Sequence, residues 1–401
     1  MTTNDDAEKA PSSGCHDDVV PIEPTLIEKA NALAAKVLAQ PKKRRVSKKL
    51  TPRAFENTQL SLFQNFLVNS DDERSQLANT FDLWDSIPRY SVSRQTMNKM
   101  RSAEGGLKLL KHDFHYRTKK YRAVISPAKI EVPNADGELV EMDFYPSANE
   151  ELVEDALRKI ATDQQQGFFD KDDYRSGVTF SLHALREELK RRGHARSFQE
   201  ITMSLRIMAK SNIEIIDISG NGEGIALSNY LPALAGVTRA DLNADPNSKW
   251  VAQFHPLVTR SIDEVTYRQF NYHKMMSHDA QLARWLHRQI VLKFTFAAIG
   301  RTFVMKFSTI KRDSAMFTGY AEGSTRLAVK ALDDAFAELM PHVILLLDKK
   351  VIRGDRSKIL DVEYSLSPSH EFVKAVKAAN KRVTLAEERL GLDRPQVSTN
   401  R

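Results

Sequence analysis

Hydrophobic and polar positions divide the chain into a polar beginning and a long patterned body. The first twenty-five residues carry Pro, Ser, Asp and Gly with few aromatics, so we expect a disordered basic tail over residues 1–54, with one short helix over residues 25–40. From residue 82 the pattern becomes that of a folded protein. The first predicted elements are two strands joined by a turn, and then a helix: Tyr121–Val132, Asn134–Gly137, Glu138–Tyr145 and Asn149–Gln164.

After this helix one order of elements occurs twice: a helix, a turn, a second helix, a strand, a loop and a strand. This order is typical of a winged helix, a DNA-binding form of the helix-turn-helix motif. We therefore predict an α+β protein with two tandem winged-helix domains. The predicted segments are a tail over 1–54, a peptide segment over 55–68, domains over 82–265 and 266–368, and a charged C-terminal helix and tail over 369–401.

The first copy has clear local signals. Ser181 is a suitable N-cap, and the leucines that follow it form one apolar stripe with helical spacing. Gly193 is suited to the left-handed position that ends this helix. Ser197 and Glu200 have the spacing of a capping box at the start of the next helix.

The faces of that second helix predict its role. Phe198, Ile201, Leu205 and Met208 fall on one side at 100° per residue. The opposite side carries Arg196, Gln199, Met203, Arg206 and Lys210, without a carboxylate. Arginine and glutamine read base edges in a major groove, and lysine holds phosphate, so Arg196, Gln199, Arg206 and Lys210 are the predicted DNA contacts. A solvated basic face on an ordinary helix is the alternative.

The strands over 212–218 and 225–230 enclose a glycine-rich turn and form the predicted wing. This turn lacks the G-x-x-x-x-G-K-[ST] pattern and precedes a strand, which argues against a phosphate-binding loop. A further strand is expected over 249–256, with Trp250 and Phe254 in the core.

In the second copy, a long helix after Ser277 directs its apolar side chains inward and Arg284 and Arg288 outward. The recognition helix begins after Ser324, and its first turns carry the predicted DNA contacts Thr325, Arg326 and Lys330. Acidic residues further along it would repel phosphate, namely Asp333, Asp334 and Glu338. Strands over 342–352 and 358–364 enclose a cationic wing tip, from which Arg353, Arg356 and Lys358 are predicted to contact DNA.

Composition narrows the choice of partner. The 401 residues include 59 Lys and Arg against 52 Asp and Glu, a net charge of +7 that weakly favours an anionic partner. The basic run over 42–49 would either grip phosphates or remain solvated, and we interpret its likeness to a nuclear localisation signal as coincidence. The single cysteine, Cys15, and the lack of a signal peptide or apolar span predict a protein of the bacterial cytoplasm.

The sequence contains no convincing pattern for a catalytic or metal site. His112 and His115 would face opposite sides of a strand, which does not suit a nicking enzyme's metal site. The other histidines are scattered, and the acidic run over 170–173 lacks the spacing of a calcium loop. We therefore predict no enzyme activity, no catalytic residues, no metal and no cofactor.

The peptide Gln59-Leu60-Ser61-Leu62-Phe63 looks like the short motif with which bacterial proteins bind the replicative sliding clamp. In an extended peptide, Leu62 and Phe63 would fill an apolar pocket and Gln59 would hydrogen-bond at its rim. The start of a buried helix is the alternative interpretation.

With this peptide upstream of two basic winged helices, the chain resembles the RepA/TrfA-type replication initiators of broad-host-range plasmids over residues 55–365. The stretch 268–277 before the second long helix also follows the family's arrangement. The resemblance implies binding to repeated origin sites in double-stranded DNA, a monomer–homodimer equilibrium, origin opening, and recruitment of the host initiator and replicative helicase. A transcriptional repressor without replication activity is the main alternative, and a winged-helix protein that binds other proteins is a second.

Overall fold

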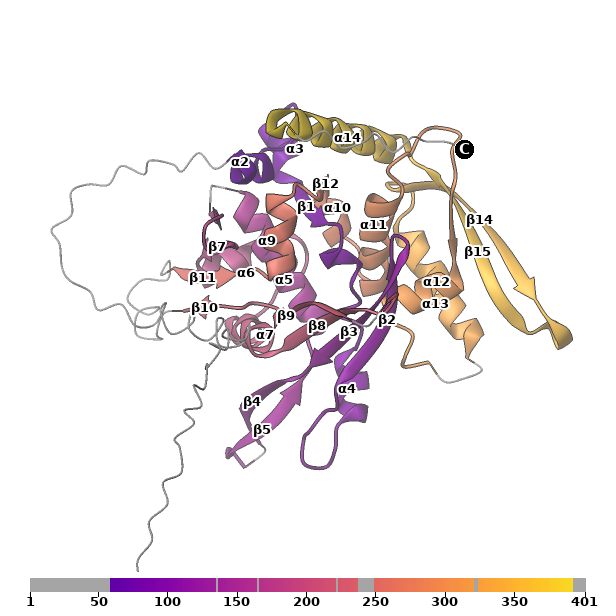
Figure 1. Ribbon diagram of the computed structural model, residues 1–401. Helices are drawn as coiled ribbons and strands as arrows, with labels where there is room; N and C mark the ends of the chain where they lie inside the picture. Colours follow the sequence, from indigo (N-terminus) through magenta and orange to yellow (C-terminus); the bar gives the residue numbers. More distant parts are fainter. Residues whose placement is uncertain are drawn as a thin grey trace, which may run out of the picture. The chain divides into compact units, whose positions relative to one another are not determined.

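The computed structural model describes residues 58–134, 136–163, 166–220, 223–236, 249–320 and 324–391. The predicted tail, its short helix and its basic run lie outside these residues. The described chain is a mixed α and β structure (Figure 1). No helix among the described residues is both long and apolar enough to span a membrane.

The first half of the body, residues 58–265, contains the predicted helix-turn-helix with its hairpin. Its helices and strands follow in the order α2 Thr58–Gln64, α3 Asp71–Ser75, β1 Leu77–Phe81, η1 Trp84–Ser86, α4 Arg94–Met100, β2 Leu110–Tyr116, β3 Lys119–Ser126, β4 Ala128–Pro133, β5 Leu139–Phe144, α5 Ala148–Thr162, β6 Gly167–Asp170, β7 Arg175–Phe180, α6 Leu182–Arg191, α7 Phe198–Lys210, β8 Asn212–Asp217, β9 Glu223–Asn229, β10 Leu234–Ala235, β11 Trp250–Gln253 and α9 Pro256–Asp263. Helices α5, α6 and α7 pack on one another, and β8 and β9 continue the sheet β2-β3-β8-β9.

The second half, residues 266–391, also contains two successive helices followed by a hairpin, and this hairpin is longer than β8–β9. Its elements are β12 Tyr267–Asn271, α10 Tyr272–Met276, α11 Gln281–Lys293, β13 Phe303–Lys306, α12 Phe307–Ser314, α13 Thr325–Glu338, β14 Ile344–Arg353, η2 Asp355–Ser357, β15 Ile359–Pro368 and α14 His370–Leu390. Strands β13, β15 and β14 form one antiparallel sheet. In Figure 1 the β14–β15 hairpin runs away from α12 and α13.

Strand β1 joins the two halves, because it pairs with β12 in antiparallel register from Leu77–Asn271 to Phe81–Tyr267. All five residues of β1 are buried. The folded body therefore begins before residue 82, where the sequence pattern placed its start. The proposed domain boundaries remain a prediction. The two halves share the β1–β12 ladder and one hydrophobic core.

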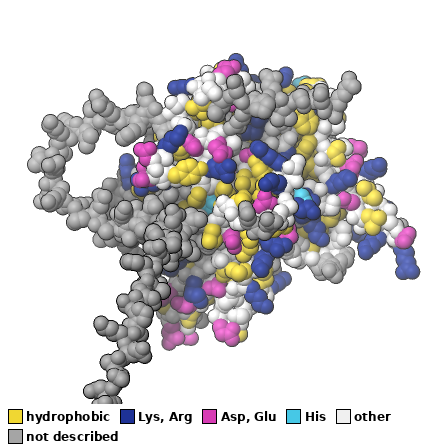
Figure 2. All heavy atoms as spheres, in the orientation of Figure 1, with side chains coloured by type: hydrophobic (Ala, Val, Ile, Leu, Met, Phe, Trp, Pro, Cys, Tyr) yellow, Lys and Arg dark blue, Asp and Glu magenta, His cyan; other side chains and the backbone are white. Residues whose placement is uncertain are grey.

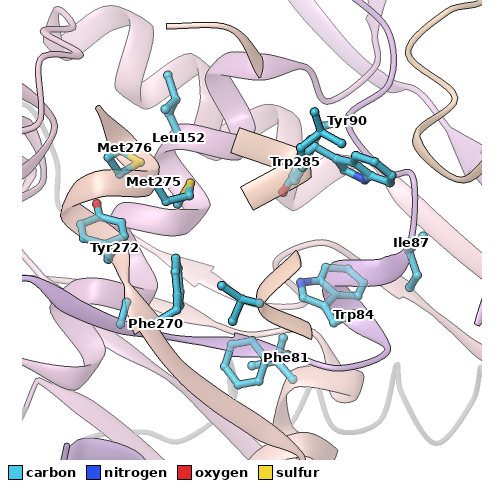
Figure 3. Packing of buried hydrophobic residues seen from close by; sticks show 14 of the residues in the cluster. Phe81, Trp84, Ile87, Tyr90, Leu152, Phe270, Tyr272, Met275, Met276 and Trp285 are labelled. Atoms are coloured by element: carbon cyan, nitrogen blue, oxygen red, sulfur yellow. The ribbon is translucent and has the colours of Figure 1, made fainter. Parts of the chain in front are cut away.

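The hydrophobic core runs through both halves without interruption. Figure 3 shows Phe81 and Trp84 on one side of this region and Tyr272, Met275 and Met276 on the other. Trp84 and Met275 are both fully buried. Removing such side chains from water is the main source of stability for the body.

A buried network of charged side chains lies within this core. Arg288 Nη2 of α11 is 2.5 Å from Asp155 Oδ2 of α5, and its Nη1 is 3.4 Å from Glu151 Oε1. On α5 itself Arg158 also bonds Asp85 Oδ1 at 2.8 Å. Four arginines balance four carboxylates, and all eight are buried: Arg89, Arg158, Arg284, Arg288, Asp85, Glu151, Glu154 and Asp155. The prediction that Arg284 and Arg288 face outward is therefore wrong, because their partners on α5 lie far away in sequence.

The predicted single strand over Tyr121–Val132 is also wrong. Pro127 divides it into β3 and β4, since proline has no backbone N–H to donate to a ladder. Strand β3 pairs with β2 and β8, whereas β4 and β5 form a separate two-stranded sheet. The β4–β5 hairpin therefore separates from the main sheet, and it packs beside α7.

Candidate nucleic-acid interface

Local capping fixes where α7 begins. Glu200 N donates to Ser197 Oγ at 3.2 Å, and Ser197 N donates to Glu200 Oε2 at 2.8 Å, which confirms the capping box. The backbone N–H and the hydroxyl of Ser197 both donate to the Glu200 carboxylate, and these two hydrogen bonds lower its pKa. The turn before α7 contains Gly193 at φ +88°, the left-handed conformation expected there.

The inner face of α7 is held by apolar packing and one polar contact. Ile201, Leu205 and Met208 are fully buried. Ser204 donates a hydrogen bond to Glu150 Oε1 of α5 at 2.7 Å, and both residues are buried. Because this contact fixes the rotation of α7 about its axis, it also fixes which side chains face solvent.

The outer face of α7 exposes the predicted cluster. Gln199, Arg206 and Lys210 are exposed, and Met203 is half-buried. Lys210 Nζ donates to the carbonyl of Lys129 on β4 at 3.3 Å. Arg196 is half-buried, and its Nη2 donates to Asn149 Oδ1 at 2.9 Å. This hydrogen bond holds its side chain at the N-terminal end of α5.

The position of Phe198 differs from the prediction for the apolar face of α7. It was expected in the core, but 43% of it is exposed. The guanidinium of Arg186 lies 4.9 Å from its ring centroid. Since Phe198 is the first residue of α7, its side chain extends beyond the packed turns and widens the exposed surface toward α6.

Helix α13 presents the second predicted set. Arg326 and Lys330 are exposed on its first turns, and Thr325 is half-buried. Lys330 Nζ lies 2.8 Å from Asp334 Oδ2, an exposed pair that solvent screens. Two of the acidic residues have structural roles. Asp333 accepts from Tyr364 Oη at 2.9 Å, and Glu338 accepts from the backbone N–H of Ala280 at 3.2 Å.

The β14–β15 hairpin carries the third set at its tip. Arg353, Arg356 and Lys358 are exposed there. Arg356 has φ +53°, and Gly354 N donates to the carbonyl of Lys358 at 2.8 Å, so the tip is a closed turn. Figure 2 shows dark blue cationic side chains gathered along this hairpin. Lys349 Nζ contacts Asp333 Oδ2 at 2.6 Å, which joins the hairpin to α13.

The ten predicted DNA contacts thus occupy three elements. Arg196, Gln199, Arg206 and Lys210 belong to α7 and the turn before it, in the first half. The α13 set and the hairpin set lie together in the second half. The predicted wing of the first half corresponds to strands β8 and β9, and residues 221 and 222 of its turn lie outside the described residues.

The segment with the clamp motif is folded. Gln59, Leu60, Ser61, Leu62 and Phe63 lie in α2, and Phe63 is 1% exposed. Its ring centroid is 5.5 Å from that of Tyr267 and 5.9 Å from that of Phe81. The expectation of an extended segment is therefore wrong, because apolar positions of the motif fill the chain's own core.

Arg382 of α14 holds the end of α2, a role that the sequence did not indicate. Its Nη2 donates to the carbonyls of Leu62 at 2.5 Å and Phe63 at 3.1 Å. Its Nη1 donates to Asn79 Oδ1 at 2.6 Å. Burial lowers the pKa of Arg382 to about 10. The guanidinium thus satisfies helix-end carbonyls that have no partner within the helix.

Comparison with known proteins gives no family assignment. No protein-family model matches the chain, and no curated protein matches it. Among solved structures, it is similar to selenomethionine derivatives of domains 2 and 3 of RctB at TM-score 0.43 and 11% identity, over 71% of this chain and 97% of that one. A second RctB structure, of domains 2–3, gives a TM-score of 0.40 at 11% identity, over 69% and 97% of the two chains. The Pi initiator protein in complex with iteron DNA gives a TM-score of 0.32 at 12% identity, over 76% and 100%.

Proposed function

We propose that the chain binds specific sites in double-stranded DNA through two winged helices and initiates replication there. The observation that carries the proposal is the exposed face of α7. It presents Gln199, Arg206 and Lys210 on a helix whose rotation is fixed by the buried Ser204–Glu150 contact. Such a face suits a major groove, where side chains preset in orientation contact base edges.

The second half supports the same role. Helix α13 exposes Arg326 and Lys330, and the adjoining hairpin ends in three exposed cations. Helix residues of this kind would contact bases, and the hairpin cations would contact phosphate or the minor groove. In this proposal both recognition helices engage one DNA site, so each half contributes to its sequence specificity.

The proposed biology follows the resemblance to plasmid initiators. The protein would act in the bacterial cytoplasm without catalysing a reaction, bind repeated origin sites and open the adjoining DNA. Its partners would be the sliding clamp, through α2, and the host initiator and helicase. A monomer–homodimer equilibrium would separate origin binding from control of its own expression.

The decisive experiment titrates the purified chain with the DNA adjoining its own gene at about physiological salt, against scrambled competitor. We expect discrimination of about 10³-fold or more, with several shifted species on repeated sites. Weak binding without sequence preference would contradict the proposal. Detection of unpaired bases next to the sites separates an initiator from a repressor, which would bind equally well and leave the duplex closed.

A further inference from the structure

A groove where the two halves meet has a composition that differs from that of the predicted DNA-binding faces. It has a volume of about 470 Å³ and lies between α14, the β1–β12 pair and the segment before β1. Its floor is apolar, with Leu77, Phe270 and Val343 among the lining residues. An apolar floor favours a protein segment over a nucleic-acid backbone, which offers mainly charged and polar groups.

The rim of this groove is cationic. Lys374, Lys377 and Lys381 line it and are exposed. They follow at intervals of three and four residues, so they lie on one side of α14. Residues 372–386 contain no Asp or Glu. No ion pair joins these three lysines to any described residue.

Charged side chains contact one another at one end of the groove. Lys274 forms an ion pair with Glu371, and His342 Nδ1 lies 3.4 Å from Glu371 Oε2. These contacts neutralise Glu371, the carboxylate of α14 that lines the groove. Glu73 is the other carboxylate of the lining, against five lysine and arginine side chains, so the groove keeps a surplus of positive charge. It is complementary to an acidic segment with an apolar tip.

The β4–β5 hairpin of the same chain has those properties. On its outer face Glu131 stands directly opposite Glu141, and both are exposed. Like charges in this position disfavour the hairpin itself, and Lys129 Nζ relieves Glu141 only at 3.5 Å. Next to the turn, Glu138 is exposed and Leu139 is 68% exposed. Figure 2 shows magenta acidic side chains at the end of this hairpin.

One chain does not bring these two surfaces together. The hairpin packs beside α7, whereas α14 packs on β12. In Figure 1 the hairpin and α14 lie at opposite ends of the drawing. The hairpin therefore does not fill the groove of its own chain.

We propose that the β4–β5 hairpin of one copy docks in the groove beside α14 of a second copy. Leu139 would enter the apolar floor, and Glu131, Glu138 and Glu141 would pair with the lysines of α14. The contact is heterologous, because the two surfaces are different parts of the chain. Each bound copy keeps one unused surface, so further copies can add. Its small area implies weak association, which matters most between copies held close together on DNA.

The test uses the full chain, free of nucleic acid, in sedimentation velocity over a range of concentrations. One variant is Lys374→Glu/Lys381→Glu, and the other is Glu131→Lys/Glu141→Lys. Each should weaken self-association by about tenfold or more, which corresponds to about 1.4 kcal/mol. A matched control, Lys99→Glu/Lys111→Glu, reverses two exposed lysines outside the groove and should associate as the wild type does.

Mixing the two variants tests whether the contact is heterologous. The first variant keeps an intact hairpin and the second keeps an intact groove, so an equimolar mixture should form a 1:1 dimer at concentrations at which each variant alone associates weakly. A chain that carries all four reversals should regain association to within a few-fold. Thermal unfolding of each variant verifies that it is folded, and Leu139→Ser provides a second test of the hairpin without a charge change.

Three results would overturn the proposal. They are a wild type that stays monomeric at every concentration, variants that self-associate as strongly as the wild type, and a mixture that stays monomeric. A groove that instead holds an acidic segment of another protein would give the first of these results. DNA binding by the monomer is measured separately, so a failure here leaves the proposed binding to specific DNA sites intact.

Discussion

Arg206 is the exposed cation midway along α7, and we expect it to contribute directly to DNA affinity. Arg206→Ala should cost about 1–3 kcal/mol at the specific site if the side chain reads a base. If it holds only phosphate, the slope of log K against log salt should fall by about one unit instead. Binding titrations at several salt concentrations distinguish the two results. Lys111→Ala on β2 is the control, and unchanged affinity and slope in Arg206→Ala would remove this residue from the interface.

His255 links stability to pH. It is buried against Trp84, with ring centroids 4.2 Å apart, and its Nδ1 accepts from the backbone N–H of Leu257 at 3.2 Å. Burial lowers its pKa to about 3. Below about pH 6.5 the imidazole of His255 therefore binds a proton in the unfolded chain, whereas in the folded chain it stays neutral until the pH approaches 3. The stabilising contribution is complete above pH 6.5 and is lost as the pH falls toward 3.

We expect the free energy of unfolding to drop between pH 7 and pH 5, and to drop less in His255→Gln. Each unit of pKa difference corresponds to about 1.4 kcal/mol. Urea unfolding at the two pH values measures the effect. His183→Gln, at an exposed position, should keep the wild-type pH dependence. Equal pH dependence in wild type and His255→Gln would show that His255 does not carry the linkage.

Helix α2 illustrates how one segment can have two uses. The clamp motif cannot fill a partner's pocket while Phe63 lies in the chain's own core, so clamp binding requires α2 to leave. The apparent affinity is then reduced by the fraction of time that α2 is undocked. Arg382→Ala removes the hydrogen bonds to the end of α2, and it should raise clamp affinity about tenfold for each 1.4 kcal/mol of lost docking.

A clamp-binding titration of the full chain measures this effect, and hydrogen exchange over α2 reports the docking itself. Arg389→Ala, near the exposed end of α14, is the control. A synthetic peptide with the sequence of residues 57–66 shows whether the motif binds at all. If the peptide binds and Arg382→Ala speeds exchange without a gain in affinity, α2 does not limit clamp binding.

Local signals predicted the local structure of the first half well. The capping box at Ser197 and Glu200, the left-handed Gly193 and the buried Trp250 and Phe254 are all confirmed. These features depend on neighbours within a few residues, which a sequence displays directly. The same patterns could not show that Phe198, at the first position of α7, stands outside the packed turns.

Long-range contacts explain the remaining errors. The buried partners of Arg284 and Arg288 are on α5, more than 100 residues earlier, so the helix pattern alone made both side chains look solvated. Strand β1 was overlooked because five buried residues show no alternation. The role of Arg382 depends on carbonyl groups of α2, and no residue type in α2 reveals that such carbonyls need a donor.

The whole body depends on the buried ion network between α5 and α11. Arg288→Met would leave Glu151 and Asp155 without their closest partner in a buried site. Breaking such a network typically costs about 3–5 kcal/mol, because the remaining charge stays desolvated. Urea unfolding should show this loss. Arg191→Met removes an exposed guanidinium from the buried Glu188, which Arg192 still pairs at 2.8 Å, so it should cost less than about 1 kcal/mol. A loss below about 1 kcal/mol for Arg288→Met would show that the network is not needed.

The pairing of β1 with β12 has a consequence for the DNA itself. Because this ladder and the shared core join the two halves, α7 and α13 cannot turn independently around a duplex. In the proposed complex the two segments of the binding site must therefore keep one rotational phase. Inserting about 5 base pairs between them, half a helical turn, should place one segment on the far side of the duplex and leave one half unbound. The protein would then measure the angular spacing of its site as well as its sequence.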